Sequence, residues 1–506
     1  MGFFKTVAVV TVFSVCEKLL GFLYRIFLSR TIGAEGIGMY QIALSVFALL
    51  LTICSSGTPI TVSRLMTKYK AENRPDKVKK IITAGLFITV VTAIPLILFF
   101  VLFPNSLTVI FADKRCASIF LVVLPGLLFT SIYAVFRGVF WGSKDFMPYS
   151  IIELLEEICM ILVGVVLISH ASSAYQGAFR AGVAVLISYV FSFLLATAVF
   201  FIRKNKFSNP RTELKPLLSS SMPVTAMRTA NSLIVSLVSI MLPIRLIAAG
   251  YSENIAMSAF GSAAGQAIPI LYIPTTLISS FTLVLVPEIA ENYYSNLTLP
   301  LKRDVEKAIK TSIFTASLCI PVFLTLGEEV GVIFFGNSDS GIFLSRSAFL
   351  MLFMSLSGIT TSILNSIGLE TKTLVYYVIG AIGMLLAVYF LPRFIGIYAL
   401  LVGYACVYVF TTVCNLRLIK KKCPVKVYYK KFLFLSILFT TITSVLGVML
   451  KRILLKYLGT FFSLIVLGIV LLGVIFVLFL VFDLVKIRTF KDKFTKKLKK
   501  KKRLTT

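Results

Sequence analysis

Charged residues are scarce in this sequence. Lys, Arg, Asp and Glu make up 14% of its 506 residues, whereas about 25% is usual for a soluble domain. The hydrophobic share is 58% and the mean hydropathy is +0.95. Apolar runs of about 20 residues, the length that crosses a bilayer as a helix, recur along the chain. A soluble globular protein is therefore excluded, and the sequence predicts an all-α polytopic membrane protein rather than a β-barrel with short alternating segments.

Residues for metal, redox and nucleotide chemistry are also rare. A single histidine, His170, argues against a His-based metal site, and the eight cysteines show no CxxC spacing. The sequence has no Walker motif and no glycine-rich phosphate loop, and its predicted loops are too short for a soluble catalytic domain. We therefore expect no enzyme activity and no cofactor. A coupling ion (H+ or Na+) or the membrane potential would supply the energy for any transport.

The apolar runs predict about fourteen transmembrane helices. They lie at 5–28, 37–60, 81–103, 117–137, 149–169, 179–202, 217–247, 258–287, 309–335, 344–366, 373–391, 397–418, 432–450 and 461–483. The first run resembles a signal peptide, but no small-residue cleavage site follows it, so we expect a retained helix.

Basic residues predict how these helices are oriented. With the N-terminus in the cytoplasm, 38 of the 51 Lys and Arg residues fall on the cytoplasmic side and nine on the outer side, as the positive-inside rule requires. Both termini are then cytoplasmic, in the cell (cytoplasmic) membrane. The tail KKLKKKKR (496–503) reads as an anchor near anionic membrane lipids. The net charge of +30 thus needs no nucleic-acid partner.

The chain also repeats internally. Several short motifs recur in the same order at offsets of about 218–228 residues: IP at 94–95 and 320–321, VIF at 109–111 and 332–334, IFL at 119–121 and 342–344, and GAEGIGM (33–39) with GYSENIAM (250–257). These offsets predict two six-helix lobes, 1–210 and 211–430, related by a parallel pseudo-twofold repeat with a substrate site between them. Residues 431–483 would add two helices, and 484–506 a basic cytoplasmic tail.

Four bases fall inside predicted spans, where burial of a charge is costly. Lys18 and Arg25 are seven residues apart and therefore share one face of the first span. Arg228 and Arg245 lie in 217–247, the equivalent helix of the second half. We predict that these bases line a water-filled cavity and bind an anion. The alternative for Arg245 alone is snorkelling to the outer interface.

Other polar residues extend this predicted site. Asn231 follows Arg228 by three residues and is expected to bind the same head group. Glu17 and Glu156 are predicted charge partners of a cavity base or carriers of a coupling proton. The alternative for the acids of the fifth span, which also include Glu153 and Glu157, is a solvated position at the cytoplasmic interface. Glu328 and Glu329 are expected at the outer interface.

The span 258–287 is interrupted by Gly261, Gly265, Pro269 and Pro274. Glycine and proline at this density permit bending and close helix approach. We predict a broken or bent gating helix that uses Gly265, Pro269 and Pro274. The alternative is a helix kinked for packing alone.

Four stretches resemble a known family. They are GFLYRIFLSRTIGAEGIGMY (21–40), FRGVFWGSKDFMPYSIIELLEE (136–157), SSMPVTAMRTANSL and LVPEIAE (285–291). Across about residues 5–430 the chain is similar to the stage V sporulation protein B family, within the multidrug/oligosaccharidyl-lipid/polysaccharide exporter (MOP) superfamily that includes MurJ-like flippases. MurJ-like members have an arginine before the first proline of the eighth helix. Here that region reads AAGQAIPI, without a base, and Arg228 is the expected substitute.

The resemblance implies a V-shaped transporter that acts without covalent chemistry. It implies a monomeric flippase that moves a lipid-linked, pyrophosphate-bearing oligosaccharide across the membrane by alternating access, with lipid II for spore cortex peptidoglycan as the expected substrate. Three alternatives stay open. The first is a MATE-like cation or drug antiporter using Glu17 or Glu156. The second is a membrane-embedded glycan polymerase, which would need acids on sizeable outer loops, whereas Glu35, Asp113, Glu253 and Asp339 are scattered over short ones. The third is a scaffold without transport activity.

Overall fold

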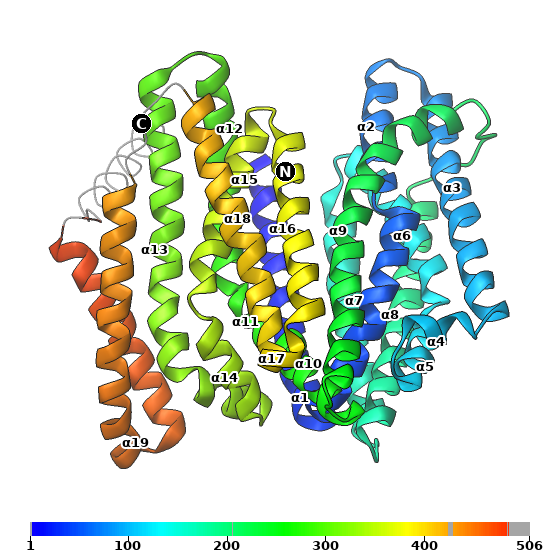
Figure 1. The fold of residues 1–506 in the computed structure, drawn as a ribbon. Helices are drawn as coiled ribbons and strands as arrows, with labels where there is room; N and C mark the ends of the chain where they lie inside the picture. Colours follow the sequence, from blue (N-terminus) through cyan, green and yellow to red (C-terminus); the bar gives the residue numbers. More distant parts are fainter. Residues whose placement is uncertain (1–2, 205, 424–428, 483, 485–506) are drawn as a thin grey trace. The chain divides into compact units, whose positions relative to one another are not determined.

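The described part of the chain is helical and contains no strand (Figure 1). The computed structural model describes residues 3–204, 206–423, 429–482 and 484; apart from residue 484, the predicted basic tail lies outside them. Ten of the helices are long and apolar enough to cross a membrane, or twelve if each of two bent pairs forms one span. The prediction of an all-α multi-pass membrane protein is therefore confirmed, whereas the count of fourteen stays a prediction.

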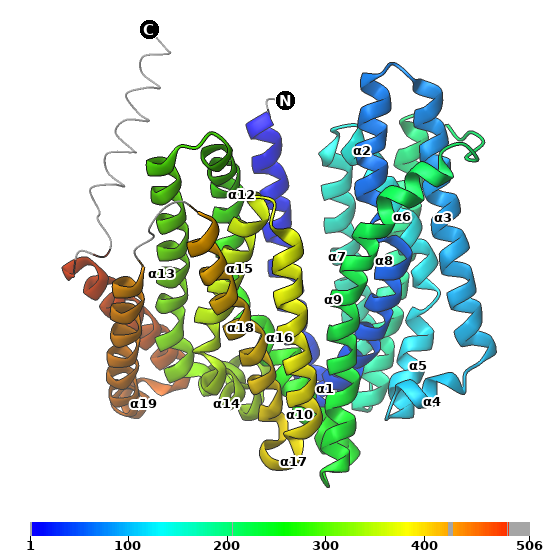
Figure 2. The same cartoon turned by 45° about the horizontal axis from the view of Figure 1, so that its top comes forward.

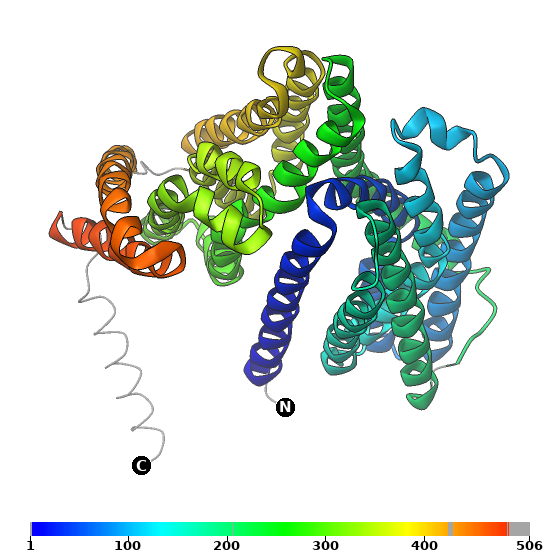
Figure 3. The same cartoon turned by 90° about the horizontal axis from the view of Figure 1, so that it is seen from below.

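Two features explain why fewer helices than predicted qualify as spans. The first two predicted spans lie in one helical segment, α1 (Phe3–Ser55), which is broken at Gly33 with φ 68° and ψ −179°. Only glycine adopts such a conformation readily, and Figure 3 shows the two parts of α1 running in different directions. The second feature is α7 (Phe146–Ile168), whose three glutamates make it too charged to qualify by composition.

The contacts within the chain divide it into two compact units. The first unit comprises Met1–Gln266 with Val388–Ile397. Besides α1 and α7 it holds α2 (Thr58–Ala71), α3 (Pro75–Leu102), α4 (Ser106–Ile110), α5 (Lys114–Val123), α6 (Gly126–Gly142), α8 (Ala174–Ile202), α9 (Leu214–Ala248), α10 (Glu253–Phe260), most of the π-helix η1 (Gly261–Ala267) and α17 (Pro392–Ile395). The predicted lobes 1–210 and 211–430 were defined by the sequence repeat, whereas these two units are defined by contacts. The division into two six-helix lobes therefore stays a prediction.

The second unit comprises Ala267–Ala387 with Tyr398–Thr506. It holds α11 (Ile268–Leu271), α12 (Ile273–Tyr294), α13 (Thr298–Val330), η2 (Gly331–Phe335), α14 (Ser338–Ser347), α15 (Leu350–Ser366), most of α16 (Glu370–Phe390), α18 (Ala399–Lys422) and α19 (Lys430–Val481); the short η3 (Gly396–Tyr398) leads into it. The last two predicted spans lie within α19, which packs beside α13 (Figures 1 and 2).

A stripe of exposed apolar side chains marks a lipid-facing surface on α3. Phe87, Val91, Ile94 and Leu98 are exposed and follow one another at helical spacing, so they lie on one face. The rest of α3 contributes to a core of buried side chains shared with α2, α6, α7 and α8. Such a stripe is favourable in hydrocarbon, where the helix satisfies its own backbone hydrogen bonds.

Polar contacts tie together the first-unit loops that are predicted to be cytoplasmic. The Tyr69 hydroxyl donates to Glu213 at 2.5 Å, and Lys77 lies 3.9 Å from the other oxygen of this buried carboxylate. Arg203 pairs with Asp145 at 2.6 Å. These residues come from three predicted cytoplasmic loops, as the alternation of spans requires. Which end faces the cytoplasm stays a prediction from the basic residues.

A buried ion pair joins α13 to α19 in the second unit. Lys451 lies 2.7 Å from Glu329, and its ammonium also donates to the Thr325 carbonyl at 3.1 Å. The Glu329 side chain is 11% exposed, so it is covered by protein, and its position at the outer interface stays a prediction. Lys451 lies between the last two predicted spans, and from there its side chain reaches Glu329 on α13.

We expect Glu329→Gln to lower the free energy of unfolding by about 1–2 kcal/mol. The amide can still accept one hydrogen bond, but the buried ammonium loses its counter-charge. Chemical unfolding of the purified protein in detergent measures the change. Glu328→Gln is the matched control, because Glu328 is exposed and should lose almost nothing. Equal losses in both variants would show that the buried ion pair does not stabilise the α13–α19 contact.

Candidate functional site

The α1 helix carries an arginine without an acidic partner. Arg25 is half-buried, and its Nη1 donates to the Gly265 carbonyl at 2.6 Å. No carboxylate among the described residues lies within ion-pair distance of its guanidinium. A guanidinium has five N–H donors, so the bond to Gly265 leaves several of them for a ligand. A partly desolvated cation of this kind favours an anion as its neighbour.

The partner of Arg25 belongs to the π-helix η1. Gln266, the next residue, is buried and donates to the Ser29 hydroxyl at 2.6 Å. Two successive residues of η1 therefore bind residues one turn apart on α1. A Cβ on Gly265 would lie 2.2 Å from Cγ2 of Ile37, so a side chain there would force α1 and η1 apart. Short π-helical stretches are frequent at functional sites.

The predicted interruption of this span is present in the structure. The η1 stretch leads into the short helix α11, which is followed by a break at Tyr272 before α12 begins. Pro269 and Pro274 each occupy a position in the first turn of these two helices, where the missing N–H of proline costs no hydrogen bond. The observed bend agrees with a gating helix, but the gating role of Gly265, Pro269 and Pro274 stays a prediction.

Glycines allow α1 to contact α10 and η1 through the backbone. A Cβ on Gly38 would lie 2.2 Å from the Met257 carbonyl oxygen, and one on Gly261 would lie 1.9 Å from the Ala34 carbonyl oxygen. The repeated segments 33–39 and 250–257 thus contain residues that touch each other. Both also begin with a glycine in the left-handed region, since Gly33 has φ 68° and Gly250 has φ 100°.

The other charged residues of α1 differ in their exposure. Lys18 is exposed and has no carboxylate within ion-pair distance among the described residues. It is seven residues from Arg25, about 10 Å along the helix. Glu17 is half-buried and interacts electrostatically with Glu153 of α7 and with Arg137 of α6. The structure therefore places Glu17 beside α7 and leaves Lys18 uncovered.

The acids of α7 have separate partners. Arg137 pairs with Glu153 at 3.2 Å, and Glu156 lies near Ser192 of α8. Glu157 faces Gly21 of α1, where a Cβ would lie 3.0 Å from its carboxylate oxygen. Arg137 was not predicted as a partner. The sequence shows that Arg137 is four residues from Trp141, whose ring it contacts. It does not show that Arg137, on α6, pairs with Glu153 on α7.

The residues of α9 do not form one site. Arg228 is exposed and donates weakly to the Ser56 carbonyl at 3.4 Å, and Asn231 is exposed one turn further on. Arg245 donates to the Tyr389 carbonyl at 2.8 Å, with its guanidinium 4.1 Å from that ring. Arg228 and Arg245 are seventeen residues apart, about 26 Å along α9. The structure thus does not bring the predicted binding residues together around a single head group.

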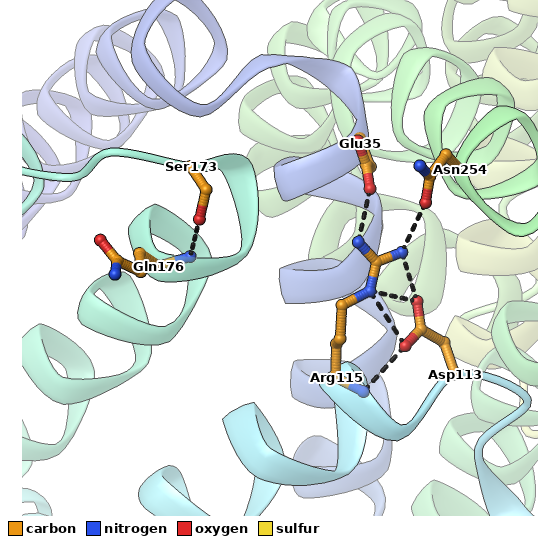
Figure 4. A network of polar contacts seen from close by, with 6 residues as sticks. All are labelled: Glu35, Asp113, Arg115, Ser173, Gln176 and Asn254. Carbon is orange, nitrogen blue, oxygen red and sulfur yellow. Dashed lines mark hydrogen bonds and ion pairs between the residues drawn. The ribbon is translucent and has the colours of Figure 1, made fainter.

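A hydrogen-bonded cluster around Arg115 was missed from the sequence (Figure 4). Its guanidinium contacts Glu35 at 2.7 Å, Asp113 at 2.8 Å and Asn254 at 2.9 Å. These groups come from α1, the N-cap of α5 and α10, and we call them the Arg115 cluster. Glu35 and Asp113, which were expected to be scattered over separate loops, in fact share one base. The three loops involved are all predicted to face outward.

The two bases of α1 favour binding of an anion. Lys18 is exposed, and Arg25 has no acidic partner among the described residues. Both lie on the same face of α1, where water or an anionic ligand could satisfy them. Among the described residues, no three His, Cys, Asp or Glu side chains are placed to hold a metal ion.

Comparison with known proteins supports a transport role. The profile of a family described as "Polysaccharide biosynthesis protein" matches residues 3–293. Stage V sporulation protein B of Bacillus subtilis (strain 168) is 24% identical over 447 residues, covering 85% of this chain and 86% of that protein. Lipid II flippase MurJ of the same organism is 24% identical over 421 residues, covering 74% of each chain.

A solved structure shares the fold. The structure titled "Lipid II flippase MurJ, inward closed conformation" superposes with a TM-score of 0.74 at 14% sequence identity, covering 93% of this chain and 98% of the other. This likeness confirms the predicted MurJ-like, all-α membrane fold. None of these relatives is named as an enzyme, in line with the expectation that the chain catalyses no covalent reaction.

Proposed function

Because this chain belongs to the polysaccharide biosynthesis protein family, we propose that it is a flippase for a lipid-linked, pyrophosphate-bearing glycan precursor. The names of the two Bacillus relatives and the MurJ-like fold support this. We further propose that the substrate is lipid II for spore cortex peptidoglycan. The protein would act as a monomer in the cytoplasmic membrane, with both termini in the cytoplasm, by alternating access.

The observation that carries the proposal is the unneutralised Arg25. A base held within a membrane-spanning helix needs a counter-charge or water, and Arg25 has no acidic partner among the described residues. A pyrophosphate would supply that counter-charge and accept several hydrogen bonds. Lys18, on the same face, would hold the second phosphate.

The remaining predicted residues receive separate roles. Arg228 and Asn231 would contact the head group as it enters or leaves, because they are exposed one turn apart on α9. The contacts between Arg245 and Tyr389 favour a positioning role at the other end of α9. Glu17 and Glu156 would take up a coupling proton.

The gating proposal concerns η1. A π-helix has one residue more per turn than an α-helix and converts to it by a local shift of hydrogen bonds. The bond between Arg25 and the Gly265 carbonyl links this stretch directly to the anion site. Ligand binding at Arg25 would therefore alter the hydrogen bonding of η1, and Pro269 and Pro274 would direct the resulting bend.

Translocation of labelled lipid II in reconstituted vesicles tests the function. We expect the wild type to be active and Arg25→Ala to lose at least about ten-fold in rate, because a charge-assisted hydrogen bond contributes about 1.5–3 kcal/mol. Arg228→Ala should have a smaller effect. Arg180→Ala is the control and should retain activity, since Arg180 donates to the backbone carbonyl of Leu167 at 3.0 Å and is not part of the proposed site.

Two outcomes would contradict the proposal. Full activity of both Arg25→Ala and Arg228→Ala would remove the anion site from α1 and α9. An inactive wild type would redirect the assignment to another glycan lipid or, if the cells export cationic dyes, to the antiporter alternative.

The same assay tests the coupling residues. If Glu17→Gln or Glu156→Gln abolishes transport but not lipid II binding, that glutamate is a coupling residue.

A further inference from the structure

A group of tyrosine hydroxyls lies inside the second compact unit. The hydroxyl of Tyr272, the residue between α11 and α12, lies 2.7 Å from the hydroxyl of Tyr408 on α18. Tyr404 stands beside Tyr408 on the same helix, with ring centroids 5.8 Å apart. Tyr377 of α16 lies near all three. We call these four residues the tyrosine cluster.

The α18 tyrosines point away from the exposed apolar face of their helix. Tyr404 and Tyr408 are four residues apart, and their rings are stacked with centroids 5.8 Å apart and planes 7° apart. The exposed apolar side chains of α18 include Phe410 and Val413. At about 100° per residue, Phe410 projects roughly 120° away from Tyr404. The two rings therefore face the protein rather than the lipid.

The same holds for Tyr377 on α16. The exposed stripe of that helix consists of Val375, Ile379 and Ile382. Tyr377 is two residues from Val375, about 200° around the helix, and so lies on the opposite face. All four members of the tyrosine cluster are half-buried rather than sealed. Each of these side chains is therefore partly accessible.

The hydrogen-bond arithmetic leaves capacity for a ligand. Each tyrosine hydroxyl donates one proton and accepts from two directions. The hydroxyls of Tyr272 and Tyr408 share one hydrogen bond, which uses one of their two protons. At least one donor and several acceptor positions remain. In a low-dielectric interior an unfilled polar position is costly, so a ligand hydroxyl or water would be favoured there.

We propose that the tyrosine cluster binds the sugar part of the lipid-linked glycan. This inference rests on the proposed function and adds a second binding site, separate in chemistry from Arg25. A sugar ring offers hydroxyls to the phenol groups and a C–H face to the aromatic rings. The four tyrosines carry no formal charge at neutral pH, so they suit the neutral sugar and not the pyrophosphate.

The ring geometry argues against a cation site. Quaternary ammonium ligands are held where several aromatic faces converge on one point. Tyr404 and Tyr408 are instead nearly parallel, so their faces do not converge on one point. Together with the hydroxyls, they suit a hydroxylated ligand better than a cation.

Binding measurements on the full-length protein in lipid nanodiscs test this inference. The two probes are lipid II, which carries sugars, and undecaprenyl pyrophosphate, which does not. We expect Tyr272→Phe and Tyr408→Phe each to raise the Kd for lipid II about five-fold, the usual effect of losing one neutral hydrogen bond. The Kd for undecaprenyl pyrophosphate should not change. Arg25→Ala should raise both.

The control is Tyr398→Phe. Tyr398 lies in the same unit, stacks on Phe343 with centroids 6.0 Å apart and has Arg346 over its ring. Its hydroxyl is not part of the tyrosine cluster, so lipid II binding should be unaffected. Thermal unfolding of each variant shows whether the phenylalanine forms are intact.

The possible failures are distinguishable. If the wild type binds neither lipid, the proposed function is wrong, and this inference, which rests on it, is wrong as well. If the wild type binds lipid II and the tyrosine variants bind it equally well, only the sugar site is wrong. Equal losses for both lipids would also overturn it, because they would indicate a structural role. A variant that loses binding of a quaternary ammonium dye and keeps lipid II would show a cation site instead.

Discussion

Gly261→Ala is expected to cost about 3 kcal/mol or more in the free energy of unfolding. A Cβ at this position would lie 1.9 Å from the Ala34 carbonyl oxygen and 2.7 Å from the Gly38 backbone nitrogen. Both atoms belong to backbone, which cannot rotate away as a side chain can. Overpacking a close-packed interface usually costs about 1–3 kcal/mol, and a backbone clash lies at the upper end or above it. Chemical unfolding in detergent measures the loss.

Gly358→Ala supplies the control for this prediction. A Cβ on Gly358 meets no atom within 4 Å, so the substitution should be neutral or stabilising by up to about 1 kcal/mol through helix propensity. Gly38→Ala should reproduce the effect of Gly261→Ala, and the double variant should lose less than the sum because the two sites share one contact. A Gly261→Ala variant as stable as wild type would contradict the backbone contact between α1 and η1.

Arg115→Ala has the second-largest expected effect, a loss of about 3 kcal/mol. The substitution leaves the buried Asp113, whose side chain is 3% exposed, and the half-buried Glu35 without their base. Removing one partner of a buried pair typically costs about 3–5 kcal/mol, and the partial exposure of Arg115 and Glu35, 30% and 26%, places the value at the lower end. The transition midpoint in chemical unfolding reports it.

Lys114→Ala is the matched control for Arg115→Ala. It removes the same charge from the adjacent position, but Lys114 is exposed and its loss should be within about 0.5 kcal/mol. Arg115→Lys should recover less than half of the stability, because an ammonium lacks the planar fork that contacts three groups at once. If Lys114→Ala and Arg115→Ala unfold at the same denaturant concentration, the Arg115 cluster does not hold α1, α5 and α10 together.

Functional assays separate these stability effects from transport. Neither Gly261 nor Arg115 belongs to the proposed anion site, so variants that remain folded should keep their affinity for lipid II. Arg25→Ala should show the reverse pattern, with a small change in stability and a large loss of binding. The comparison therefore distinguishes residues that hold the helices together from residues that contact the substrate.

Much of the fold and part of the site were predictable from local features of the sequence. Long apolar runs specify membrane helices because hydrocarbon admits only backbone that satisfies itself. The bend in 258–287 was predictable because Pro and Gly act on their own helix. Arg25 could be identified because a base inside an apolar run stands out regardless of its surroundings.

The sequence by itself determined the class of the protein, the position of most of its helices and the choice of Arg25 as a candidate anion-binding residue. Only the tertiary structure decided that Gly38 meets Gly261, that Arg115 gathers acids up to 80 residues away, and that Arg245 is engaged by Tyr389. The physical reason is that helices in a membrane recognise each other through shape and a few polar bonds rather than through apolar burial. A pattern along one helix shows which face is polar, but the partner of that face depends on which helices approach closely enough to touch.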